Sequence, residues 1–284
     1  MTDLIYINGF WTDEQDAKIS VLDHGLLYGD GIYEGIRIYK RQIFKYHEHF
    51  ERLQRSARGI GLVLPISGHD LERLIGEGLE KTGLLNAYVR VVITRGTGPI
   101  GPDPTPCYQP GLILIIKDIP PLHGDDNPTL KTAISTMRRV AVDSNTAEIK
   151  SLNYLPSVLG KAEASRLGVD DVVMLDSQGF LSEAPVANIF VRVGDRILTP
   201  SVTNGILPGI TRQFVIELLH SLGQSVEVGN ITPIQLLNAD EAFLTGTHAE
   251  IVPISEHNGQ LLGDGVPGPV FKMVKAAFDE SVSR

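Results

Sequence analysis

A proline-rich break in the sequence limits the folds that this chain can adopt. Residues 120–128 read PPLHGDDNP, where prolines flank a polar turn, as is typical of a connection between domains. Strand-like and helix-like stretches lie on both sides of this break. At 284 residues, the chain has room for two parts that each bury a core. We therefore predict an α+β fold with domains at 1–119 and 129–284, joined by a linker at 120–128.

The order of the expected elements differs between the two parts. In the first, alternating runs such as GIYEGIRIY predict antiparallel strands. From His47, apolar residues at helical spacing predict a helix that ends at a glycine, Gly61. In the second part, YLPSVLGKAEASRLG and GITRQFVIELLHSLG predict helices, and residues 171–200 predict a three-strand meander.

Composition and charge argue against several classes of partner. The hydrophobic fraction of 42% and the charged fraction of 21% are those of a globular protein. The net charge of −9 argues against binding to nucleic acid or to an anionic membrane. The single cysteine, Cys107, cannot form an internal disulfide. No apolar run reaches about 20 residues and the start lacks a signal-peptide pattern, so we expect a cytoplasmic protein.

Two glycine-containing stretches are candidates for binding an anion. In NGILPGITRQF, a proline and a glycine precede a helix, so the N–H groups of Ile210 and Thr211 lie at its positive end. In LTGTHAE, a glycine and Thr247 follow a strand and add further donors. Each stretch taken alone is equally compatible with an ordinary helix start or turn.

Two ionisable residues in this part of the chain require an explanation. Glu183 stands among apolar residues in GFLSEAPVANIF, and is either buried with a partner or exposed on an edge strand that contains Pro185. Lys150 stands in EIKSLNY, just before a helix. A lysine, an isolated carboxylate and two anion-binding loops are the groups that pyridoxal phosphate needs for its Schiff base, ring nitrogen and phosphate.

Other chemistries lack the residues that they need. His47 and His49 stand two apart on a predicted helix and point to different faces, so they cannot chelate one metal ion. No Cys/His cluster of the sequence has ligand spacing, and we predict no metal site. The G-x-S-x-G stretch of a hydrolase is also missing from the sequence.

The sequence resembles the class IV, fold type IV, pyridoxal-phosphate-dependent aminotransferases, which include branched-chain and D-amino acid aminotransferases. The resemblance implies a small N-terminal α/β domain that supplies the substrate pocket and a larger, β-rich α/β domain that binds the cofactor. It also implies a homodimer or a higher homo-oligomer. The matching stretches follow the family's order from residue 20 to 255 and read LDHGLLYGDGIYEGIRIY, HFERLQRSA, YVR, IKSLNYLPSVLGKAEA, LSEAPVANIF, GILPGITR and AFLTGTHAEIVPI.

The resemblance assigns a role to individual residues. Lys150 corresponds to the lysine that forms the Schiff base and transfers the proton. Glu183 corresponds to the carboxylate that keeps the pyridine nitrogen protonated, and Tyr154 to the tyrosine that bonds the phenolic oxygen of the cofactor. The remaining cofactor-binding residues, which hold the phosphate or pack on the ring, are Arg52, Leu207, Ile210, Thr211 and Thr247.

The substrate pocket resembles that of the branched-chain enzymes. The implied substrate-binding residues are Tyr28, Tyr33, Tyr88, Arg90, Thr247 and His248. D-amino acid aminotransferases carry an Arg and a His in the loop after TRGT, where this sequence has Ile100 and Pro102. We therefore predict transamination of L-leucine, L-isoleucine and L-valine with 2-oxoglutarate, giving branched 2-oxo acids and L-glutamate.

Two departures from the branched-chain pattern keep other substrates open. His248 stands where the family has a small residue, and Ala184 with Pro185 stands where Gly and Ser or Thr are common. D-amino acid and (R)-amine transaminases and aminodeoxychorismate lyases share the scaffold. The competing hypothesis is a phosphate-binding protein that is not an enzyme. The presence of both Lys150 and Glu183 argues against it.

Overall fold

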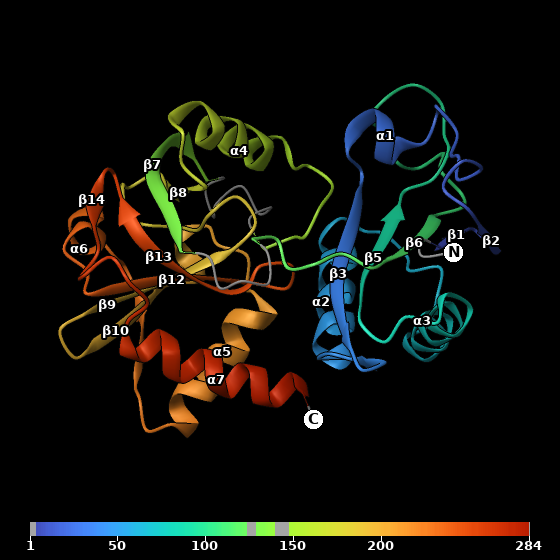
Figure 1. Ribbon diagram of the computed structural model, residues 1–284. Coiled ribbons are helices and arrows are strands. Elements are labelled where there is room, and N and C mark those ends of the chain that lie inside the picture. The colour runs from blue at the N-terminus through green and yellow to red at the C-terminus, as the bar shows by residue number, and fades with distance from the viewer. Residues whose placement is uncertain (1–3, 124–128, 140–147, 284) are drawn as a thin grey trace. The chain divides into compact units, whose positions relative to one another are not determined.

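The computed structural model describes residues 4–123, 129–139 and 148–283 (Figure 1). The chain forms two compact units. The first comprises Met1–Ile119 and Ile149–Asn153, and the second comprises Pro120–Glu148 and Tyr154–Arg284. Each unit combines helices with one β-sheet, as an α+β fold requires.

The first unit is built on an antiparallel sheet with the strand order β2-β1-β6-β5-β3-β4. Helices α2 and α3 pack on one face of this sheet through Leu53, Leu71 and Ile75. The elements are β1 (Leu4–Ile7), β2 (Phe10–Thr12), α1 (His24–Tyr28), β3 (Gly31–Tyr39), β4 (Gln42–Ile43), α2 (Tyr46–Gly59), α3 (Gly68–Thr82), β5 (Ala87–Thr94) and β6 (Gly111–Lys117).

The alternation of side chains along β3 and β5 gives this sheet two chemically different faces. On β5, Val89 and Val91 are buried beneath the helices, so Tyr88 and Arg90 point to the opposite face. The strands pair Gly35 with Arg90, and residues that lie directly opposite share a face. The sheet therefore presents its apolar face to the helices and its polar face elsewhere.

The segment Ile149–Asn153 belongs to the first unit, although the sequence around it belongs to the second. It pairs with the start of β3, at Ile32. The short strand β4 pairs only with the other end of β3, at Ile38 and Tyr39. The Leu152 N–H donates to the Gly31 carbonyl (3.0 Å), and Ser151 forms a bridge with Ile32. The predicted domain at 129–284 does not anticipate this pairing.

The boundary after the first unit falls at Ile119, where the predicted linker 120–128 begins. Residues 124–128 of that linker lie outside the described residues. Among the described helices, none combines the length and apolar character that crossing a bilayer requires.

The second unit is built on a mixed sheet with the strand order β11-β10-β9-β12-β13-β7-β8, to which β14 adds beside β13. Its buried core includes Val173, Ile189 and Leu244 from three of these strands. The elements are β7 (Leu130–Arg138), α4 (Leu155–Leu167), β8 (Asp171–Leu175), β9 (Asn188–Val193), β10 (Arg196–Pro200), η2 (Val202–Asn204), α5 (Ile210–Ser221), β11 (Val226–Gly229), α6 (Pro233–Leu237), β12 (Glu241–Gly246), β13 (Glu250–His257), β14 (Gln260–Leu261) and α7 (Pro269–Ser283).

The predicted meander at 171–200 is confirmed in its turns but is incomplete. Residues 180–183 return antiparallel to β8, since the Ser182 N–H donates to the Met174 carbonyl (2.9 Å) and the Met174 N–H to the Glu183 carbonyl (3.0 Å). Strands β9 and β10 form the expected antiparallel hairpin, but β8 also pairs in parallel with β7, at the opposite edge of the sheet from β10 and β11, which was not predicted. The reason is helix α4, which connects β7 to β8 as a crossover and so places the two strands side by side.

Candidate active site

Lys150, the predicted Schiff-base lysine, is held through its main chain in the first unit. Its N–H donates to the Ser56 hydroxyl of α2 (3.1 Å), and its carbonyl accepts from the N–H of Tyr33 in β3 (3.0 Å). Its amine donates to the Tyr33 hydroxyl (3.2 Å) and lies 4.3 Å from the centre of that ring. The backbone of Lys150 is therefore fixed, while its amine stands at the end of a flexible stem.

Further predicted residues gather around the same tyrosine. The guanidinium of Arg90 lies 4.2 Å from the centre of the Tyr33 ring. Tyr88 stands two residues before Arg90 on β5 and points to the same face. Its hydroxyl passes so close to Gly35 that a Cβ there would lie 2.2 Å from it. One surface of the first unit thus carries two phenols and two cations, one of which is Lys150.

Tyr28 lies at the end of α1, where it helps to hold a loop. Its hydroxyl accepts from the Gly101 N–H (2.6 Å), and its ring packs edge-on against His24, with 4.9 Å between ring centres. The Nε2 of His24 donates to the Pro99 carbonyl (2.9 Å). Two side chains of α1 therefore fix the loop that carries Ile100, whose side chain is 83% exposed.

Arg52, predicted to bind phosphate, forms a buried ion pair with Glu34. Its guanidinium donates twice to that carboxylate (2.7 and 2.9 Å), which also accepts from His49 Nδ1 (2.8 Å). Burial alone raises the pKa of Glu34, but the charge and hydrogen bonds of Arg52 and His49 outweigh it and hold that pKa well below its usual range. Burial lowers the pKa of His49 despite the acid beside it.

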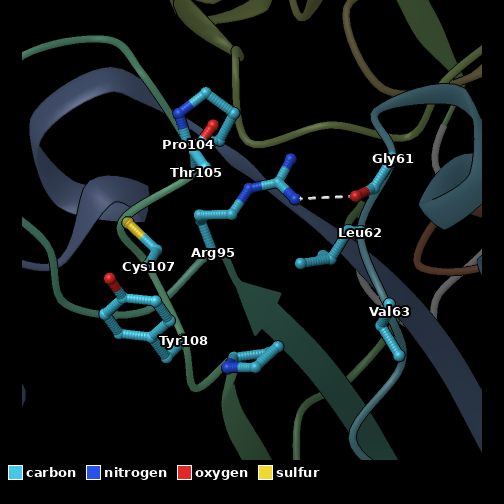
Figure 2. Close-up of a pocket in the computed structure, with 9 residues that line it drawn as sticks. Gly61, Leu62, Val63, Arg95, Pro104, Thr105, Cys107 and Tyr108 are labelled. Carbon is cyan, nitrogen blue, oxygen red and sulfur yellow. Dashed lines mark hydrogen bonds between the residues drawn. The ribbon is translucent and has the colours of Figure 1, made fainter.

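A pocket of about 360 Å³ lies on another part of the first unit, around Arg95 (Figure 2). The Arg95 guanidinium donates to both oxygens of Asp30 (2.8 and 3.0 Å) and to the carbonyls of Gly61 (2.9 Å) and Ile60 (2.6 Å). The positive charge of Arg95 is therefore balanced by Asp30 within the protein. The pocket contains none of the predicted site residues, and its lining consists of Gly61, Leu62, Val63, Arg95, Pro104, Thr105, Cys107, Tyr108 and Pro110.

In the second unit, Glu183 is buried and paired, and is not an exposed edge-strand residue. Only 5% of it is exposed. Its carboxylate forms an ion pair with Arg139 (2.6 Å) and accepts from the Asn188 side chain (2.8 Å) and the Leu207 N–H (3.1 Å). Burying this charge would be costly without these partners, so they keep it ionised and fix its direction.

Sequence reasoning missed two of these partners. Arg139 directly follows β7, and Asn188 begins β9, so both reach Glu183 from other elements. The one signal in the sequence was Glu183 itself, because a carboxylate buried among apolar residues needs a positively charged partner. Asn188 also donates to the Leu207 carbonyl (3.0 Å), so one amide connects the acid to the loop before α5.

The N-terminus of α5 is suited to an anion. Gly209 occupies the position before the helix, where no side chain among the described residues caps it. Ile210 and Thr211 follow and are buried. A Cβ at Gly209 would lie 2.0 Å from the Asn188 side-chain oxygen, so the close approach of this loop to β9 requires a glycine. The first-turn N–H groups and the helix dipole favour a negative group at this point.

The remaining predicted residues also lie in the second unit. Thr247 and His248 form the turn between β12 and β13, and β12 pairs beside β9 so that Thr245 lies opposite Asn188. Tyr154 precedes α4 and is half-buried. The second unit therefore brings the Glu183 cluster, the α5 terminus and this turn to neighbouring parts of one sheet.

Most of the chain matches a known family. Residues 31–257 match the family described as amino-transferase class IV. The chain is a class IV aminotransferase. This match confirms the predicted family. The chain is therefore described as an aminotransferase and not as a non-catalytic phosphate-binding protein.

Relatives of this aminotransferase carry two different activities in their names. A putative branched-chain-amino-acid aminotransferase of Methanocaldococcus jannaschii is 42% identical over 276 residues, which are 97% of this chain and 95% of that protein. A D-alanine aminotransferase of Bacillus licheniformis is 32% identical over 282 residues, which are 98% of this chain and 96% of that protein.

Solved structures confirm the fold of the aminotransferase. The branched-chain amino acid aminotransferase of Escherichia coli is 32% identical and superposes with a TM-score of 0.94, covering 99% of this chain and 94% of that one. The branched-chain aminotransferase of Thermoproteus uzoniensis, solved with norvaline, is 31% identical with a TM-score of 0.92, covering 100% and 95%. The predicted fold is therefore correct.

We expect Arg139 to be needed for amino-group transfer because it balances the buried charge of Glu183. Arg139→Gln should lower turnover by about 10- to 100-fold, as loss of a preorganised charge does. The neighbouring Arg138 is exposed and donates to the Ser135 carbonyl (3.0 Å), so Arg138→Gln is a matched control that should leave turnover unchanged. Equal turnover of the two variants would contradict the role of Arg139.

Proposed function

We propose that this aminotransferase exchanges amino groups between L-branched-chain amino acids and 2-oxoglutarate, with pyridoxal 5′-phosphate as its cofactor. The observation that carries the proposal is the cluster around Tyr33, where the amine of Lys150 and the guanidinium of Arg90 lie 4.3 and 4.2 Å from one ring centre. An amine suits the cofactor, and a guanidinium suits an acidic substrate. The names of several relatives support the substrate class.

The residues of the second unit fit this cofactor. Glu183 is an ionised carboxylate in a fixed direction, as a protonated ring nitrogen requires. The uncapped first turn of α5, with Ile210 and Thr211, suits a phosphate. When bound, pyridoxal phosphate supplies a ring that takes up the negative charge developed at the substrate Cα.

The side chains of the first unit have complementary tasks. The Lys150 amine would hold the cofactor and then accept the proton from the substrate Cα. The Tyr33 hydroxyl, which accepts from that amine (3.2 Å), orients it. Arg90 presents a charged anchor for the side-chain carboxylate of glutamate, and the buried Tyr33 ring beneath it holds the guanidinium in place.

Transfer from D-alanine is the second candidate, because a D-alanine aminotransferase is among the relatives. The loop after TRGT argues against it. D-specific members of the family place an Arg and a His there, whereas this chain has Ile100 and Pro102. An exposed isoleucine cannot bind a carboxylate.

Lys150 should carry the covalent link to the cofactor. In the wild type, reduction with borohydride should leave pyridoxyl phosphate attached to the chain, and mass spectrometry should locate it at Lys150. Lys150→Ala should abolish both this adduct and transamination. The exposed Lys131 offers a control, because Lys131→Ala removes a lysine of the second unit and should change neither result. An adduct that persists in Lys150→Ala would disprove the assignment.

Arg90 should matter most for the acidic substrates. Arg90→Leu should lower kcat/KM for L-glutamate and 2-oxoglutarate by about 30-fold or more relative to L-leucine, because a charge-assisted contact of roughly 2 to 5 kcal/mol is lost. Arg90→Lys keeps the charge and should show a smaller change.

A spectrophotometric panel of L-leucine, L-glutamate, D-alanine and (R)-1-phenylethylamine measures these ratios. Faster conversion of D-alanine or the (R)-amine than of L-leucine would refute the branched-chain assignment but not the transaminase chemistry.

We also propose that the working unit is a homodimer. Exposed apolar side chains gather at the start of α4, where Leu155 is 66% and Val158 is 58% exposed. Such groups are commonly covered in oligomers, of which twofold dimers are the most frequent. Light scattering of the active enzyme should give about twice the chain mass of 31.0 kDa. An active species with the mass of one chain would contradict this.

A further inference from the structure

His248 makes two contacts with the segment through which the chain enters the second unit. Its Nε2 lies 3.2 Å from the Pro120 carbonyl, and its own carbonyl accepts from the Leu122 N–H (2.8 Å). A carbonyl can only accept, so Nε2 carries a proton and donates. The imidazole is therefore engaged with main chain 128 positions away in the sequence.

Beyond the packing of the Leu122 side chain against the core of the second unit, the main chain of this segment is bound by side chains. Pro120 and Pro121 have no N–H to donate, so the segment cannot fasten itself through these residues. On the preceding side, the Ile119 carbonyl accepts from Nη1 of Arg37, a buried side chain of β3 (2.5 Å). Two consecutive carbonyls are thus bound by long side chains, one from each unit.

The other end of the His248 contact is the turn that carries Thr247. His248 is the middle residue of the turn Thr247–Ala249 between β12 and β13, and β13 begins at Glu250, whose φ is positive (57°). A single-residue change at the middle of so short a turn acts on both of its neighbours. An alanine there would end at Cβ and could not reach the Pro120 carbonyl.

We propose that His248 is a positioning residue, which ties Pro120–Leu122 to the β12–β13 turn and so fixes the main chain of Thr247. The assignment replaces direct binding of substrate by this imidazole. It rests on the proposed function only in giving Thr247 a place at the cofactor phosphate. The tie itself is a property of the second unit, and can be measured without any turnover.

Hydrogen exchange of the cofactor-loaded enzyme tests the tie. A proteolytic fragment that begins at Pro120 reports the Leu122 amide as its first exchangeable backbone group, because both prolines lack one. His248→Ala should speed exchange at Leu122 about tenfold or more, as loss of a local anchor does. His248→Gln keeps a side-chain N–H donor and should restore slow exchange. His220→Ala, which changes an exposed histidine at the end of α5, is the control and should behave as wild type.

Binding of pyridoxal phosphate and steady-state kinetics of the same variants test the positioning. His248→Ala should weaken cofactor binding about three- to thirtyfold, whereas kcat at saturating cofactor changes less than threefold, and His248→Gln should recover most of the affinity. Faster exchange without weaker cofactor binding would overturn the positioning role. Unchanged exchange in His248→Ala, together with a shifted preference between L-leucine and L-glutamate, would instead place the imidazole on the substrate. If no amino donor were converted by the wild type, the proposed function would fail, while the exchange at Leu122 would still decide the tie.

Discussion

The buried carboxylate of Glu34 is the interaction on which the first unit depends. The alternation of β3 turns this acid towards α2, where a charge is tolerated only because Arg52 and His49 bind it. The same contacts fix α2 on the sheet. One helical turn beyond Arg52, Ser56 accepts the N–H of Lys150. An ion pair inside the unit therefore helps to position the main chain of Lys150 in the same unit.

The second unit solves a similar problem with different elements. Glu183 is buried on a sheet and kept ionised by Arg139, which follows β7, and by the amide of Asn188. In both units, an arginine from a neighbouring element lets a carboxylate stay charged where water is largely excluded. These paired charges give the aminotransferase fixed electrostatic groups without relying on exposed side chains, whose contacts are weak.

Local patterns predicted the elements and the residues in motifs, but not the partners. The helical spacing after His47 anticipated α2, observed at Tyr46–Gly59, and EIKSLNY singled out Lys150, whose amine lies beside Tyr33. Arg139 was not predicted because its partner is 44 positions away, and nothing in the run MRR marks the first arginine as exposed and the second as half-buried and paired. The pairing of β8 with β7 was missed for the same reason, since periodicity describes a strand and not its neighbour.

The contact between Gly209 and Asn188 couples two ends of the candidate site. Any side chain at Gly209 would push on the Asn188 oxygen, and the nitrogen of that same amide holds both Glu183 and the Leu207 carbonyl. A substitution made to reshape the anion-binding turn would thus be felt at the acid. On the proposed function, substitutions at the phosphate-binding turn and at the acid assigned to the ring nitrogen are therefore not independent, because the Asn188 amide contacts both.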